Sequence, residues 1–133
     1  MVTGVAPARG PEVTTIGRQF AEALARKDRA ALRGLLAPDV SFKGLTPGRF
    51  WEAEDPDGVF EIVFGTWFDD QDRIEGVEVT DGEPVADTEH VGYRLSLTTP
   101  DGPHVAAQQA YLRVADERIV YLRVLCSGFR PVV

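Results

Sequence analysis

Two polar residues have the position and the chemistry to act on a small molecule. Tyr93 and Gln108 each lie in a stretch of alternating apolar residues, the pattern of a strand that buries one face. A phenol hydroxyl and an amide N–H donate hydrogen bonds that stabilise charge on a carbonyl oxygen. We therefore predict Tyr93 and Gln108 as the catalytic residues. A structural explanation stays open for each, Tyr93 as a core ring and Gln108 as an amide bonded to a loop or to water.

The other reactive residue types predict no second site. Cys126 ends a third alternating stretch and is explained as a small buried residue, since no cation or histidine stands beside it to activate the thiol. His90 has the parity of an outward-facing residue, and His104 follows Pro103 in a predicted turn. Two histidines and scattered acids match no zinc or iron spacing. We therefore expect no metal ion and no cofactor.

Length and charge restrict the class of protein and its partners. The 133 residues suit a single domain, which we place at residues 12–133 behind a flexible tail at residues 1–11. The formal net charge of −7 repels phosphate groups, so we expect neither nucleic acid nor a membrane as a partner. The single cysteine excludes an intrachain disulfide and favours a cytoplasmic protein. The lack of Asn and the excess of Arg over Lys indicate a GC-rich bacterial genome.

Apolar residues at steps of three and four predict helices in the first half of the chain. They run from about residue 12 to residue 37, interrupted at Asp28, which suits the N-cap of a second helix that Pro38 ends. A third helix begins at Asp55-Pro56, a cap followed by proline at the first helical position. Its apolar stripe is Val59, Phe60, Val63, Phe64 and Trp67.

Elsewhere in the chain, apolar residues recur at every second position, a period that predicts a sheet. Residues 39–45 alternate and form a short strand, residues 46–54 form a loop, and everything after Arg73 is sheet with hairpins at Asp81-Gly82 and Asp101-Gly102. The fold class that we expect is α+β, with three N-terminal helices packed on a curved antiparallel sheet, a cystatin-like cone.

One face of this sheet and the helices above it would enclose an apolar, aromatic pocket. Gln108 shares the inner face with Ala106, Ala110 and Leu112, and Val120 shares it with Leu122. An apolar small molecule is the ligand that such a lining favours. The predicted lining residues, besides Tyr93, are Phe42, Trp51, Phe60, Phe64, Trp67, Leu95, Leu122, Val124 and Cys126.

Three segments resemble a known family: FAEAL at residues 20–24, LLAPDVSF at residues 35–42 and DERIVYLR at residues 116–123. With the order of elements, they resemble the nuclear-transport-factor-2-like superfamily, which includes SnoaL-like polyketide cyclases and ketosteroid isomerase. The resemblance extends from the first helix to Phe129 and implies a cone around a small-molecule pocket. It implies a cofactor-independent isomerase, cyclase or lyase acting on an apolar metabolite, although the superfamily hosts several reactions and binding modules.

The carboxylates that the resemblance implies are missing from this chain. The position of the isomerase base corresponds to Gly44, and the acid that follows the last-strand arginine in SnoaL-like cyclases corresponds to Val124, after Arg123. The alternative is therefore a noncatalytic ligand-binding or dimerisation module that lacks the family carboxylates. In either case the resemblance implies a homodimer that pairs through the outer face of the sheet. The residues that we expect there are Val105, Tyr111, Tyr121 and Arg123.

Overall fold

A computed structural model describes residues 15–132 of the chain. The predicted tail at residues 1–11 lies outside the described residues. The elements, in chain order, are α1 (Ile16–Ala25), α2 (Arg29–Leu35), β1 (Leu36–Thr46), β2 (Arg49–Ala53), α3 (Pro56–Ile62), the π-helical turn η1 (Val63–Trp67), β3 (Arg73–Asp81), β4 (Glu89–Thr99), β5 (Gly102–Ala115), β6 (Arg118–Cys126) and β7 (Arg130–Pro131).

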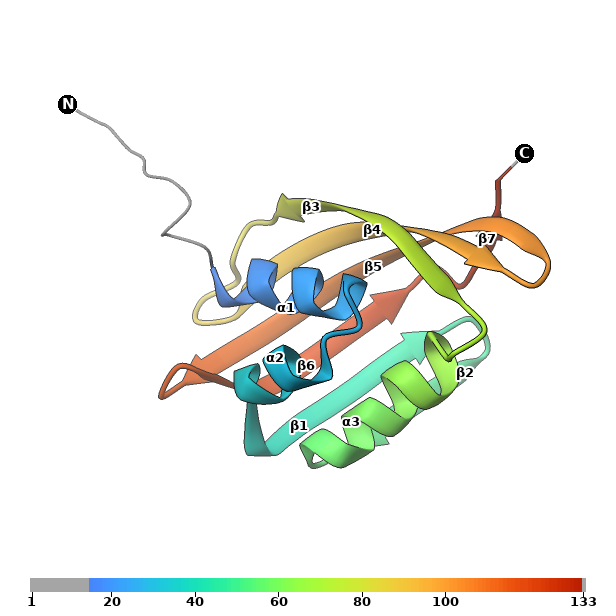
Figure 1. Ribbon diagram of the computed structural model, residues 1–133. Coiled ribbons are helices and arrows are strands. Elements are labelled where there is room, and N and C mark those ends of the chain that lie inside the picture. The colour runs from blue at the N-terminus through green and yellow to red at the C-terminus, as the bar shows by residue number, and fades with distance from the viewer. Residues whose placement is uncertain (1–14, 133) are drawn as a thin grey trace.

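The strands form one mixed sheet, and the expectation of a purely antiparallel sheet is wrong. The order across the sheet is β2-β1-β6-β5-β4-β3, with the short β7 paired to β5 (Figure 1). Only the β1–β6 pair is parallel among the described strands. Parallel neighbours need a long connection. Here the chain between β1 and β6 supplies it by building α3 and four further strands first.

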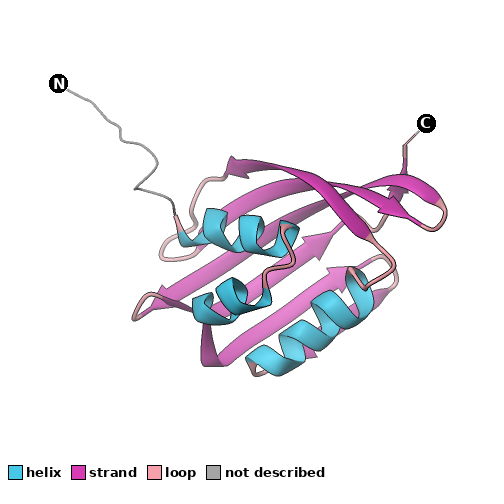
Figure 2. Cartoon of the chain, viewed as in Figure 1, coloured by secondary structure: helices cyan, strands magenta, loops and turns pink. Residues whose placement is uncertain are grey.

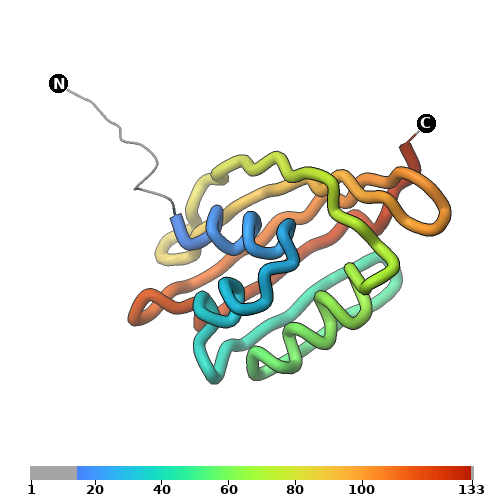
Figure 3. Tube along the Cα trace, in the orientation of Figure 1, coloured from blue at the N-terminus to red at the C-terminus, as the bar shows by residue number. Residues whose placement is uncertain are grey.

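All three helices lie on one face of the sheet (Figure 2). Helix α1 packs on β3 and β4, α2 on β1 and β6, and α3 on β1 and β2. Only α1 and α2 precede the sheet, since α3 follows the β1–β2 hairpin. After η1 the chain enters β3 at the opposite edge of the sheet (Figure 3). No described helix covers the other face, so we call the helix-covered face the inner face and the opposite one the outer face.

The helix starts follow the predicted capping chemistry. The side chain of Asp28 accepts a hydrogen bond from the Ala31 amide at 3.0 Å, and that of Asp55 accepts one from the Gly58 amide at 2.8 Å. Each carboxylate thus pairs one of the amides that the first turn of a helix leaves unbonded.

The predicted loop at residues 46–54 is wrong, because its second half is strand β2. Pro47 and Gly48 form the tight turn of a hairpin, with Gly48 at a φ of +77° that favours glycine. Thr46 pairs with Arg49 directly across this turn. The predicted strand at residues 39–45 also begins earlier, at Leu36.

A shift of register on β6 changes which of its residues faces the helices. Ile119 is fully buried, whereas Val120 is only partly buried. The cause is an irregularity in the β5–β6 pairing, where Arg113 pairs with Tyr121 but Val114 pairs with Ile119. Such a bulge places one extra residue on one strand and reverses the parity of the residues beyond it. The prediction that Val120 faces the helices is therefore wrong.

Candidate functional site

The structure brings the two predicted catalytic residues together. Tyr93 on β4 and Gln108 on β5 are direct partners across the two strands, and the Tyr93 hydroxyl donates to Oε1 of Gln108 at 2.7 Å. Both side chains are buried, with 3% and 1% exposure. Cys126 on β6 is the partner of Gln108 on its other side. The three residues thus form one row across the inner face of three adjacent strands.

The Tyr93 hydroxyl serves this row as a donor. Burial, together with the neighbouring Cys126, raises the pKa of the Tyr93 phenol above its ordinary value. The phenol therefore stays protonated at neutral pH and cannot act as a base there. Its ring packs edge-on against Phe20 of α1, with the ring centres 6.2 Å apart.

The amide nitrogen of Gln108 has no hydrogen-bond partner within residues 15–132. Because Oε1 receives the Tyr93 proton, Nε2 must point away from that hydroxyl. A buried polar group without a partner costs about 1–3 kcal/mol. Such a group in a folded protein calls for an explanation, and a ligand or a bound water is the usual one.

A second buried donor lies at the end of η1. The indole Nε1 of Trp67 also has no partner within the described part of the chain, although the ring is only 8% exposed. The neighbouring Trp51 differs, because its Nε1 donates to the Thr46 hydroxyl at 2.8 Å. The two indole rings meet edge to face, with centres 6.1 Å apart. From the sequence, Trp67 is predicted only as an apolar lining residue.

The Trp67 ring lies against Gly44, the position at which the resemblance implies a family carboxylate. A Cβ atom built on Gly44 would lie 2.7 Å from Cη2 of Trp67, closer than real atoms approach. The π-helical turn, in which the Phe68 amide bonds the Val63 carbonyl at 2.8 Å, ends where this ring meets β1. The other position, Val124, is 4% exposed and belongs to the same apolar cluster. Glycine at position 44 is therefore what allows the indole to lie against the sheet.

The other predicted lining residues lie in the layer between helices and sheet. The rings of Phe42 and Trp67 are 5.9 Å apart, and those of Phe60 and Phe64 are also 5.9 Å apart. Arginines of α2 cover the outer sides of Phe60 and Phe64. An enclosed cavity within this layer stays a prediction. One apolar cluster contains Phe42, Phe60, Phe64, Leu95, Leu122 and Val124, with Trp51 packed against it.

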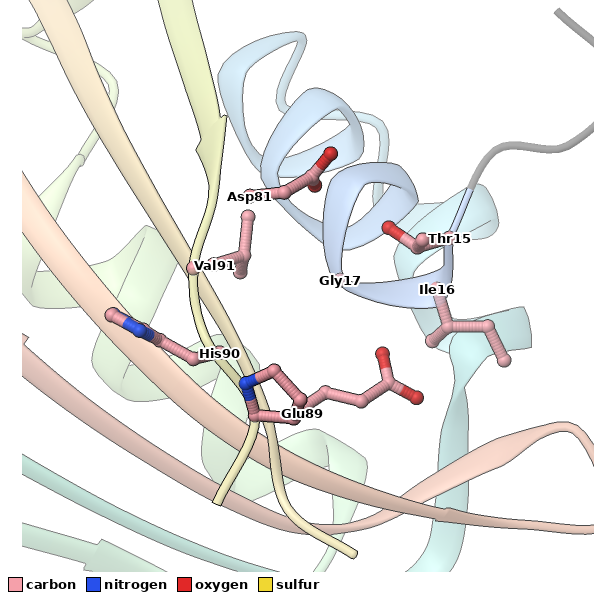
Figure 4. A pocket seen from close by; sticks show the side chains of 9 residues that line it. Thr15, Ile16, Gly17, Asp81, Glu89, His90 and Val91 are labelled. Atoms are coloured by element: carbon pink, nitrogen blue, oxygen red, sulfur yellow. The ribbon is translucent and has the colours of Figure 1, made fainter. Parts of the chain in front are cut away.

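A surface hollow of about 380 Å³ lies at the start of α1 (Figure 4), and none of the predicted site residues lines it. Asp81 and Glu89 contribute carboxylates to it, and Arg18 lies 3.5 Å from Asp81. His90 turns to the outer face as predicted, where it bonds Gln109 at 2.5 Å and stacks on Tyr111. His90 is itself one of the residues that line the hollow.

Two further findings concern metals and membranes. Within residues 15–132, no group of three or more His, Cys, Asp and Glu side chains could hold a metal ion. His104, predicted in a solvated turn, is partly buried, and its Nδ1 lies 2.9 Å from the Gly102 carbonyl. Among the described helices, none has the length and apolar character needed to cross a membrane.

Comparison with known families identifies the class of protein. The SnoaL-like domain matches residues 17–122, most of the chain. The chain therefore belongs to the SnoaL-like domain family, within the nuclear-transport-factor-2-like superfamily. No curated protein sequence matches the chain significantly.

Solved structures show the same fold at low sequence identity. A protein named as an isomerase from Rhodopseudomonas palustris is 18% identical, with a TM-score of 0.70 over 87% of this chain and 92% of its own. A protein named as a SnoaL-like polyketide cyclase from Mesorhizobium loti is 15% identical, with a TM-score of 0.62 over 82% and 94%. A protein of ketosteroid isomerase-like fold from Catenulispora acidiphila, in complex with trimethylamine, is 19% identical, with a TM-score of 0.62 over 84% and 85%. At these identities the likeness concerns the fold.

Proposed function

We propose that this SnoaL-like protein binds an apolar, carbonyl-bearing metabolite on its inner face and isomerises or cyclises it. One observation carries the proposal: a buried glutamine amide that Tyr93 holds in one orientation and that lacks a partner of its own within the described residues. The family membership and the relatives named as isomerase and cyclase support the same reaction class.

The chemistry available to this site is polarisation by hydrogen bonds. The Gln108 amide would donate to the carbonyl oxygen of the ligand, while Tyr93 keeps that amide aligned through Oε1. An aligned, desolvated donor stabilises the charge that grows on such an oxygen during enolisation or ring closure. Aromatic and aliphatic side chains such as Phe42 and Leu95 would hold the apolar part of the ligand. None of these steps needs a cofactor.

The second candidate function is ligand binding without turnover. It is favoured by the lack of carboxylates: the buried polar or charged residues of the described chain are Thr99 and Gln108, and neither is an acid. Gly44 and Val124 hold the positions where family members carry one. Without a carboxylate base, another group of the substrate or a water molecule would have to take up the proton. Turnover of a ligand that binds therefore separates the two candidates.

We also propose that the protein forms a homodimer through the outer face. Three exposed apolar side chains are neighbours there: Leu45 pairs with Phe50 on one side and with Leu125 on the other. Each of the three is at least half exposed. On the same sheet, the guanidinium groups of Arg113 and Arg123 lie 4.4 and 3.9 Å from the ring centre of Tyr121. An apolar patch with an ordered polar rim is typical of an interface.

The test of ligand binding compares Gln108→Leu with wild type against a panel of apolar aromatic ketones. We expect the variant to lose affinity about tenfold for a ketone that binds wild type, equivalent to about 1.4 kcal/mol. Its unfolding midpoint should fall modestly, because leucine leaves the buried Tyr93 hydroxyl without its acceptor. Gln109→Leu, on the outer face, is the matched control and should bind as wild type does. The double variant Tyr93→Phe with Gln108→Leu removes both partners and should restore the midpoint. A double variant that stays far below wild type would mean that the amide is structural, and the proposal would fail.

A further inference from the structure

We infer that Trp67 is a second ligand-binding donor, and that the ligand is a flat, neutral molecule with a carbonyl oxygen at each end. This inference rests on the proposed function, since it assigns a ligand class to the same inner face. Its new element is the indole N–H of Trp67. Together with the Gln108 amide, it gives the inner face two buried donors without acceptors in the described chain.

The two donors flank one strand of the sheet. The Trp67 ring lies against Gly44 on β1, and Gln108 lies on β5, with β6 between them. Gly44 pairs with Val124 of β6, and Gln108 pairs with Cys126 two residues further along. Neighbouring strands are about 4.8 Å apart, so the strand positions of Gly44 and Gln108 are on the order of 10 Å apart. A two-ring aromatic molecule with a carbonyl group at each end has this span.

The charge of the site selects a neutral ligand. The described inner face offers N–H donors but no buried arginine, lysine or histidine. A carboxylate buried there would lack a cation to offset the loss of its hydration, which costs several kcal/mol. A ketone oxygen needs only the one or two hydrogen bonds that these donors can supply. Neutral carbonyl groups therefore fit the site better than acids do.

The residues near the two donors differ slightly in exposure. Trp67 and Cys126 retain 8% and 7% exposure, whereas Gln108 between strands β4 and β6 retains 1%. A ligand that entered beside the slightly more exposed Trp67 and Cys126 would reach the Gln108 amide last. The apolar middle of the ligand would then lie over Val124, and its two oxygens would meet the two N–H groups.

The chain contains a matched control for the Trp67 donor. Trp51 touches Trp67, but its indole N–H is already bonded to Thr46. Trp67→Phe removes a donor that has no partner in the described chain, so the unfolding midpoint should fall only by the packing that the smaller ring loses. Trp51→Phe removes a bonded donor and leaves Thr46 without that proton, so the midpoint should fall.

The experiment measures by calorimetry the affinities for three naphthalenes that are substituted at both ends. The diketone carries two acetyl groups, the monoketone carries one acetyl and one ethyl group, and the hydrocarbon carries two ethyl groups. In wild type the diketone should bind about tenfold tighter than the monoketone, and the monoketone tighter than the hydrocarbon. Trp67→Phe should lower the affinity for the diketone to that for the monoketone. Trp51→Phe should leave the preference for two acetyl groups intact.

Two results would overturn the inference. If wild type binds the diketone no more tightly than the monoketone, Trp67 is not a donor to the ligand, and this comparison needs no variant to fold. If Trp67→Phe keeps the full preference for the diketone, the same conclusion follows. In either case a Gln108→Leu variant that still weakens monoketone binding leaves the proposed function standing. If none of the three naphthalenes binds, the ligand class is wrong, and the proposed function is then decided by the wider ketone panel.

Discussion

The polar groups on the two faces of the sheet differ in whether they have hydrogen-bond partners. On the outer face, Arg123 donates to the Ser41 carbonyl at 2.8 Å, and Arg113 donates to the Thr88 hydroxyl at 2.9 Å. On the inner face, the amide of Gln108 and the indole of Trp67 are buried without such partners in the described chain. Solvent can satisfy a polar group on the open face, but not one beneath the helices. The face that cannot tolerate unpaired donors is therefore the one that carries them, which points to a ligand.

The largest effect should come from restoring a side chain at Gly44. A Cβ atom there meets the Trp67 ring, so Gly44→Ala should lower the free energy of unfolding by about 2–3 kcal/mol, as overpacking of a core does. Urea unfolding measures this change. The double variant Gly44→Ala with Trp67→Leu should recover much of the loss, because the smaller side chain frees the space.

The control for this prediction is the exposed helical Gly34. A Cβ atom there meets no other atom within 4 Å. Gly34→Ala should therefore raise the free energy of unfolding by about 0.5–1 kcal/mol through helix propensity. Equal effects of the two glycine substitutions would show that Trp67 does not press on Gly44.

The next effect should come from Tyr93→Phe. The change leaves Oε1 of Gln108 without its hydroxyl partner as well, so the free energy of unfolding should fall by about 1–2 kcal/mol. Tyr121→Phe on the outer face should cost less, since that ring keeps both arginine contacts. The double variant Tyr93→Phe with Gln108→Leu should be more stable than Tyr93→Phe alone. A double variant that loses the sum of both single losses would contradict this coupling.

The smallest effect on stability should come from the outer face. Leu125→Glu places a charge beside Leu45 on an exposed strand position, so the free energy of unfolding should change by less than about 0.5 kcal/mol. Its association should change instead. Sedimentation at tens of micromolar should show a dimer for wild type and a monomer for the variant. A wild-type protein that is monomeric at this concentration would rule out the proposed dimer.

Much of the fold could be predicted from local pattern. The alternation around Tyr93 and around Gln108 predicted their common face, and burial confirms it. The caps at Asp28 and Asp55 predicted the starts of two helices. These signals are local, because they depend on residues within a few positions of one another.

The rest depends on contacts between distant residues. The parallel pairing of β1 with β6 joins Gly44 to Val124, and no local period shows that partner. The hydrogen bond from Tyr93 to Gln108 requires the register of β4 on β5, which fixes two positions fifteen residues apart. The unpaired Trp67 nitrogen has no sequence signal, since its neighbour Trp51 is the same residue type with its donor bonded.

The most direct test of the central claim observes the two indole N–H groups themselves. In nitrogen-15-labelled protein, each tryptophan gives one indole signal, and Trp67→Phe assigns them. On titration with the naphthalene that carries two acetyl groups, the Trp67 signal should move downfield and its N–H should exchange more slowly with water, while the Trp51 signal keeps its position. The naphthalene with two ethyl groups should produce no downfield shift. A Trp67 signal that responds identically to both compounds would contradict the account.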